Sequence, residues 1–140
     1  MVTDPLTAAL ADLRASGVHH LGLVTPYIES IARPVRNAFA DAGHVVAQTL
    51  TFGEEAEARV ARIAPALIKA AARAAAKEAE AVFLSCTNLR ALDIIDDLEA
   101  ELGIHDPSSN QVLAWHMARA TGAPVATDAP GRLLRMTKAQ

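Results

Sequence analysis

The sequence predicts an α/β protein in which helices cover both faces of a parallel sheet of about four strands. Three observations support this prediction. Short apolar runs alternate with helical stretches along the chain, as in βαβ units. The runs are apolar almost throughout, which is typical of strands buried on both faces. The length of 140 residues suits one domain, which we expect to span residues 1–140.

The predicted strands are apolar runs bounded by turn-forming or polar residues. They cover residues 20–25, 44–50 and 81–85, with a short fourth strand at 104–107. Pro26 should end the first strand, because proline has no N–H group for the sheet. Residues 51–55 should form a loop after the second strand.

The predicted helices carry apolar residues at spacings of three and four. They cover residues 6–15, 27–42, 56–63, 65–79, 89–102 and 111–121. Pro34 predicts a kink or a break near Arg33. In the helix at 89–102, Leu92 is among the residues expected to point inward, with Ile95, Leu98 and Leu102. Residues 108–110 should cap the last helix, and a small apolar segment follows at 131–136.

Composition excludes several classes of protein. Hydrophobic residues make up 51% and charged residues 21%, which excludes a disordered chain. The net charge of −3 and the lack of a basic stretch argue against nucleic acid as a partner. No apolar run approaches the ~20 residues of a membrane helix. Residues 1–5 do not resemble a signal peptide, and the one cysteine cannot form an internal disulfide, so we expect a cytoplasmic protein.

Small polar residues follow three of the predicted strands, where ligands bind in parallel sheets. They are Thr25 and Tyr27, the run from Ser85 to Asn88, and the run from Ser108 to Asn110. Cys86 should lie at the N-terminus of a helix, where backbone N–H groups favour anions and thiolates. The alternatives are a buried, inert cysteine, ordinary helix caps at 108–110, and a surface ring at Tyr27. The histidines lack the spacing of metal ligands, so no metal site is predicted.

Two blocks of sequence resemble the aspartate/glutamate racemase superfamily. They are VFLSCTNLRALDIIDDLEAELG (82–103) and SSNQVLAWHMAR (108–119). Within the superfamily, the match is to the branch that holds maleate cis–trans isomerase, arylmalonate decarboxylase and the ectoine-utilisation protein. LGLVTPYI (21–28) and FGEEAEARVARIAP (52–65) look most like the ectoine-utilisation members, and GRLL (131–134) resembles the closing strand.

The resemblance implies a flavodoxin-like fold and chemistry without a cofactor or a metal. Members of the superfamily have two similar domains, and each typically offers one cysteine to a small carboxylate bound between them. On this pattern Cys86 corresponds to the catalytic cysteine of the second domain. The positions that would hold the substrate carboxylates are Thr25, Tyr27, Thr87, Asn88, Ser109 and Asn110.

The chain differs from the superfamily pattern because it corresponds to the second half alone. One interpretation is a half-length isomerase, racemase or decarboxylase that acts through Cys86. The other is a non-catalytic, carboxylate-binding or subunit-like half-domain. A homodimer with facing Cys86 thiols, or a separate chain, could supply the missing half. A smaller difference is His105-Asp106, where relatives have an apolar strand.

Overall fold

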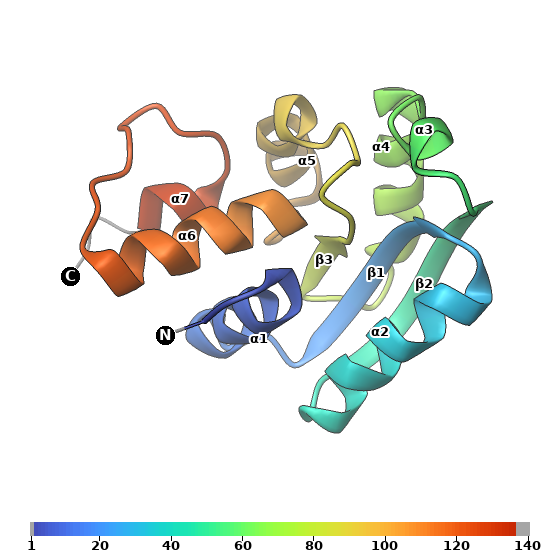
Figure 1. Ribbon diagram of the computed structural model, residues 1–140, viewed down its shortest axis with the longest axis horizontal. Coiled ribbons are helices and arrows are strands. Elements are labelled where there is room, and N and C mark those ends of the chain that lie inside the picture. The colour runs from blue at the N-terminus through green and yellow to red at the C-terminus, as the bar shows by residue number, and fades with distance from the viewer. Residues whose placement is uncertain (1, 137–140) are drawn as a thin grey trace.

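The computed structural model describes residues 2–136 and has a three-layer, flavodoxin-like α/β arrangement, with helices on both sides of a parallel sheet (Figure 1). Its elements are α1 (Pro5–Ser16), β1 (His20–Tyr27), α2 (Glu29–Asp41), β2 (Val45–Glu54), α3 (Glu57–Val60), α4 (Pro65–Ala75), β3 (Ala81–Leu84), the 3₁₀ helix η1 (Leu92–Ile94), α5 (Ile95–Leu102), α6 (Ser109–Thr121) and α7 (Arg132–Met136). Within this range no helix is long and apolar enough to cross a membrane.

The sheet has three strands in the order β2-β1-β3, all parallel, and not the expected four or so. The segment predicted as a fourth strand does run beside β3, but it forms only isolated bridges from His105 to Ala81 and from Ser108 to Leu84. Two local features explain the missing strand. Pro107 has no N–H to donate, and the N–H of Asp106 donates to the Glu99 side chain (3.3 Å).

The two faces of the sheet bury separate apolar clusters. Leu21, Leu23 and Phe83 pack with α1, α2, α6 and α7, whereas Val24 and Leu84 pack with α3, α4 and α5. This alternation follows from the two-residue period of a strand. Most of the core is aliphatic, as the low aromatic content predicts.

The first two strands are longer than predicted. β1 continues through Pro26 to Tyr27, and Tyr27 pairs with Glu54 of β2. Pro26 is tolerated because it lies at a break in the register between Thr25 and Tyr27. Residues 51–54, predicted as a loop, therefore belong to β2, and Gly53 takes a left-handed backbone conformation there (φ 68°).

Several of the predicted helices are confirmed. α1 and α4 form close to their predicted positions, and Ser108 caps α6 in a capping box with Gln111. Pro34 lies inside α2 without breaking it.

Two predictions for the later segments are wrong. The helix predicted from residue 89 begins only at η1, and Leu89 and Ala91 before it are buried in an irregular segment. Leu92, which was expected to point inward, is 48% exposed. The segment that resembles a closing strand is instead the helix α7, which buries Leu133 and Leu134 against α1 and α6.

Candidate active site

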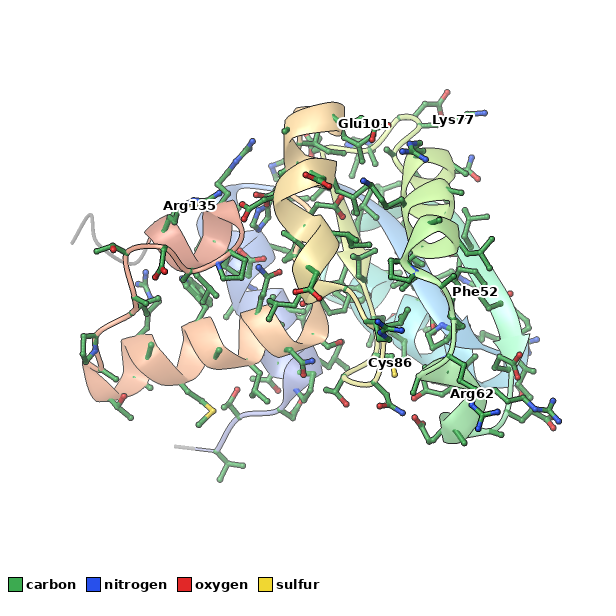
Figure 2. All side chains as sticks on the ribbon, turned by 90° about the horizontal axis from the view of Figure 1, so that it is seen from above. Phe52, Arg62, Lys77, Cys86, Glu101 and Arg135 are labelled. Carbon is green, nitrogen blue, oxygen red and sulfur yellow. The ribbon has the colours of Figure 1, made fainter. Side chains whose placement is uncertain are left out.

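The three predicted groups of polar residues meet at the carboxyl end of the sheet. Tyr27 ends β1, Cys86 lies just beyond β3, and Ser109 begins α6. Figure 2 labels Cys86 and shows its sulfur on the loop that follows β3. The meeting follows from the parallel topology, since the carboxyl ends of parallel strands lie at one edge.

Cys86 has an unusual backbone conformation, with a φ of 149° that residues other than glycine rarely adopt. Two hydrogen bonds hold it there. Its N–H donates to the Ser109 hydroxyl (3.0 Å), and its carbonyl accepts from the N–H of Leu89 (3.3 Å). The backbone of Cys86, and with it the half-buried side chain, is thus held in place by α6 and by the turn from Cys86 to Leu89.

The sulfur of Cys86 has two polar neighbours. The Tyr27 hydroxyl lies 3.1 Å from Sγ, and the backbone N–H of Asn88 donates to Sγ over 3.3 Å. The expected helix N-terminus directly after Cys86 is absent, because helical structure starts only at Leu92. The thirteen-residue helix α6 is the one whose N-terminus reaches this site, through Ser109.

Sequence reasoning missed one residue of the site, Glu57 on α3. The Tyr27 hydroxyl donates to Glu57 Oε1 over 2.6 Å. The side-chain amide of Asn88 donates to the Glu57 carbonyl (3.0 Å) and to Oε2 (3.2 Å). Burial above all, and then Cys86 and Glu57, raise the pKa of Tyr27, so the phenol stays neutral. Glu57 belongs to a segment that resembles the superfamily, but its contact with Tyr27 depends on the fold.

The other predicted residues are spread around Cys86. Asn110 donates from its side chain to the Thr87 carbonyl (2.9 Å), and both residues are exposed. Thr25 is 1% exposed, its hydroxyl has no hydrogen-bond partner among residues 2–136, and it does not join the Cys86 cluster. A cavity of about 250 Å³ lies beside Cys86 and is lined by Pro5, Leu6, Val35, Phe83, Ser85, Cys86, Thr87 and Ser109.

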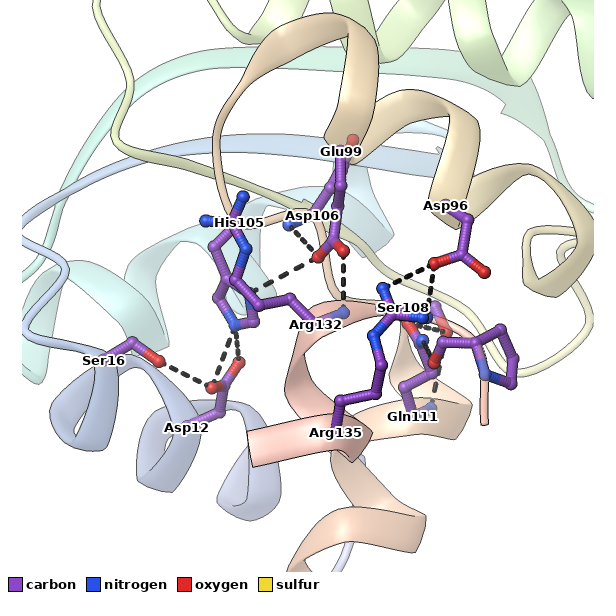
Figure 3. Close-up of polar contacts among 12 residues, drawn as sticks. Asp12, Ser16, Asp96, Glu99, His105, Asp106, Ser108, Gln111, Arg132 and Arg135 are labelled. Carbon is purple, nitrogen blue, oxygen red and sulfur yellow. Dashed lines mark hydrogen bonds and ion pairs between the residues drawn. The ribbon is translucent and has the colours of Figure 1, made fainter. Parts of the chain in front are cut away.

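A second polar cluster is buried elsewhere, where His105 bridges to the first residue of β3 (Figure 3). His105 Nε2 lies 2.8 Å from Asp12 Oδ2, and its Nδ1 lies 3.7 Å from Glu99 Oε1. Burial alone would lower the pKa of His105, but the contacts with Asp12 and Glu99 outweigh it and raise the pKa to about 9. The cluster packs α1, α5 and the segment before α6 together, and none of its residues contacts Cys86.

A flavodoxin-like half with a cysteine on the loop just beyond a parallel strand is characteristic of the aspartate/glutamate racemase superfamily, and the chain is a member of it. The model of the arylmalonate decarboxylase family matches residues 2–134, and the chain belongs to this family.

Two characterised relatives and one solved structure define the similarity. Arylmalonate decarboxylase of Bordetella bronchiseptica is 33% identical over 123 residues, which cover 86% of this chain and 51% of the relative. Maleate isomerase of Nocardia farcinica is 28% identical over 141 aligned residues, covering 99% of this chain and 56% of the relative.

The solved structure is a cysteine-to-serine mutant of maleate cis-trans isomerase from Nocardia farcinica with a covalently bound succinylcysteine intermediate. It matches with a TM-score of 0.85 at 30% identity and covers 94% of this chain and 55% of that one. The chain thus spans about half the length of the relatives that it matches.

Proposed function

We propose that the protein acts on a small carboxylate through the thiol of Cys86, as a cofactor-independent racemase, isomerase or decarboxylase. The observation that carries this proposal is the geometry of the sulfur. Cys86 Sγ borders a cavity and lies within hydrogen-bond distance of the Tyr27 hydroxyl (3.1 Å) and the Asn88 N–H (3.3 Å). The similarity to an arylmalonate decarboxylase and a maleate isomerase supports this substrate class.

The chemistry needs a proton donor and a site for a negative charge. Loss of carbon dioxide or of a proton next to a carboxylate leaves an enediolate, whose charge is stabilised by fixed hydrogen-bond donors. We assign this binding role to Thr87, Asn88, Ser109 and Asn110, which lie around Cys86. For Thr25, which is buried, and Tyr27, whose hydroxyl donates to Glu57, the same role stays a prediction from the resemblance. The Cys86 S–H then gives its proton to the substrate carbon, and the resulting thiolate keeps the Asn88 N–H as a donor.

A covalent step is the variant of this chemistry that the succinylcysteine of the Nocardia relative suggests. There a thiolate sulfur would add to a carbon–carbon double bond, and elimination would restore both the double bond and the thiolate. On the superfamily pattern the cysteine that adds belongs to the first domain, so this route would need the other half, and Cys86 would serve it as the proton-transferring thiol of the second domain.

Alkylation of the single cysteine tests the proposal, because the label can fall only on Cys86. We expect phenylmalonate or maleate to slow its reaction with iodoacetamide several-fold, and acetamide at the same concentration to have no effect. Proton NMR of the same mixtures then detects turnover, with Cys86→Ser as the inactive control. The absence of both protection and turnover would contradict the proposal.

The second candidate is a non-catalytic, carboxylate-binding half-domain, which would show protection without turnover. The exposure of Thr87, Asn88 and Asn110 favours it, since an open site admits water.

We further propose that residues 1–140 form one domain equivalent to the second half of the two-domain relatives, and that a second copy or another chain completes the site. A cytoplasmic location and a link to ectoine utilisation remain predictions from the sequence.

A further inference from the structure

The three side chains Glu57, Tyr27 and Cys86 form a continuous chain of hydrogen bonds from α3 to the sulfur. Tyr27 Oη lies 2.6 Å from Glu57 Oε1 and 3.1 Å from Cys86 Sγ. The Asn88 side chain donates to Glu57 Oε2 (3.2 Å) and to the Glu57 carbonyl (3.0 Å), which fixes the carboxylate from its other side. The geometry is therefore set by contacts from two elements, β1 and α3, and from the loop after β3.

The Tyr27 hydroxyl has a single proton for two neighbours. An ionised carboxylate can only accept hydrogen bonds, so the short contact with Glu57 takes the Tyr27 proton. The phenol oxygen then faces the sulfur with its lone pairs, and only a protonated thiol can donate to it. A thiolate at Cys86 would instead face the lone pairs of Tyr27 and the negative charge of Glu57.

We propose that Glu57 is a positioning residue that acts through Tyr27 to keep Cys86 in its thiol form, ready to give a proton. This inference rests on the proposed function for its meaning, since a proton donor is useful only where a substrate accepts the proton. It assigns to α3 a role that neither Cys86 nor the carboxylate-binding residues supply.

The surrounding charges are consistent with control by Glu57. The other charged side chains on α3 and at the end of β2 include Arg59 and Glu54, which pair with each other (3.8 Å). On the side of α6, the Cys86 N–H donates to the neutral hydroxyl of Ser109 (3.0 Å). Among the described residues, Glu57 is thus the charged side chain that contacts the Tyr27–Cys86 pair.

The experiment is the pH profile of Cys86 alkylation by iodoacetamide in the full chain, which follows the thiolate fraction. Glu57→Gln should move the midpoint about half a pH unit to one pH unit lower, because the amide carries no charge and frees the Tyr27 proton. At a pH below the midpoint, this shift is a rise of about three- to tenfold in rate. Glu55→Gln is the matched control, since Glu55 is exposed and forms no hydrogen bond or ion pair among residues 2–136.

A double variant tests the path through Tyr27. In a Tyr27→Phe background, we expect Glu57→Gln to shift the midpoint no more than Glu55→Gln does. An equal shift with and without the Tyr27 hydroxyl would overturn the proposal, because the charge would then act directly on the sulfur. A midpoint unchanged by Glu57→Gln would overturn it as well.

Circular dichroism and urea unfolding establish that each variant is folded. The pH profile needs neither substrate nor turnover. The proposed role of Glu57 can therefore be contradicted while dicarboxylates still protect Cys86. Equally, loss of protection would count against the proposed function and leave the role of Glu57 in the profile intact.

Discussion

Asp106 is a fully buried carboxyl group, and neither of its side-chain oxygens has a hydrogen-bond partner within the described part of the chain. Burial above all, and then the charge of Glu99, raise its pKa to about 8, while His105 works in the opposite direction. The folded protein therefore holds a proton at Asp106 that an unfolded chain releases near pH 4. Because the folded state binds this proton more tightly, the free energy of unfolding falls as the pH rises from about 4 to about 8.

We predict that Asp106→Asn makes the protein more stable at pH 8 and leaves its stability near pH 4 almost unchanged. The asparagine side chain cannot ionise, so the difference between the variant and the parent should grow by about 2–5 kcal/mol over this range. Urea unfolding at a series of pH values measures it. Asp128→Asn is the control, since Asp128 is exposed and forms no hydrogen bond or ion pair among the described residues 2–136. Parallel stability profiles for Asp106→Asn and the parent would show that the buried carboxyl does not titrate as described.

Like Asp106, His105 makes the folded protein less stable as the pH rises. Its pKa rises to about 9 on folding, so the stability from its contacts with Asp12 and Glu99 is complete below about pH 6.5 and is lost as the pH rises through 9. The pair His105-Asp106 stood out in the sequence as a departure from an apolar strand. The structure explains the departure, because both residues belong to a buried polar cluster and not to a regular strand.

At the scale of elements, the contact between α4 and β1 depends on Gly22. A Cβ atom at this position would lie 2.2 Å from the carbonyl oxygen of Ala75. The absence of a side chain lets the last turn of α4 lie directly against the central strand. Because the obstacle is backbone, a rotamer change could not relieve the clash.

We predict that Gly22→Ala destabilises the protein by about 1–3 kcal/mol or more, because α4 must move away from β1. The matched control is Gly53→Ala on β2. There a Cβ atom meets nothing within 4 Å, and only the left-handed backbone (φ 68°) opposes the change. That cost should be about 1 kcal/mol. Thermal or urea unfolding compares the two variants, and equal losses would contradict the role of the close contact.

The elements also show what the sequence could predict. The buried strands follow from short apolar runs, and Ser108 with Gln111 follows from a local capping pattern. Local patterns could not place the extension of β2 to Glu54, which depends on pairing with Tyr27 across a register shift. They failed in the same way at α7, where packing against α1 and α6 makes a helix of a segment expected to be a strand. Glu57 was missed because its partners, Tyr27 and Asn88, are about thirty residues away on either side.

At the scale of the whole molecule, the candidate site is open on one side. Glu57, Thr87, Asn88 and Asn110 are all exposed around a half-buried Cys86. The exposed large apolar side chains among the described residues are scattered over different elements, including Ile31, Val45, Leu67, Leu92 and Met117. These apolar side chains do not form one broad face around the site, so a partner that covers Cys86 would meet the exposed polar groups of Glu57, Thr87, Asn88 and Asn110.

We predict that the cover is a second copy of this chain in a two-fold symmetric dimer, since an isologous pair is the commonest solution for one gene product. In such a dimer the two Cys86 thiols would face each other across a shared cleft and could act on opposite sides of one small carboxylate. Light scattering at micromolar concentration should then give twice the mass of the 140-residue chain. A monomer would contradict the prediction and point to a separate partner chain.

The facing of the thiols has its own test, because the chain has only one cysteine. Two sulfurs much more than ~10 Å apart could not both serve one small substrate, since reacting atoms must approach to ~3–3.5 Å. A bis-maleimide with a span of about 10 Å should therefore link two chains at Cys86, as expected if one substrate lies between the thiols. A small dicarboxylate should slow the reaction by occupying the cleft, and Cys86→Ser should not be linked at all. A dimer by mass that resists this reagent, while each thiol still reacts with iodoacetamide, would mean that the two copies associate through another face and that each site remains half complete.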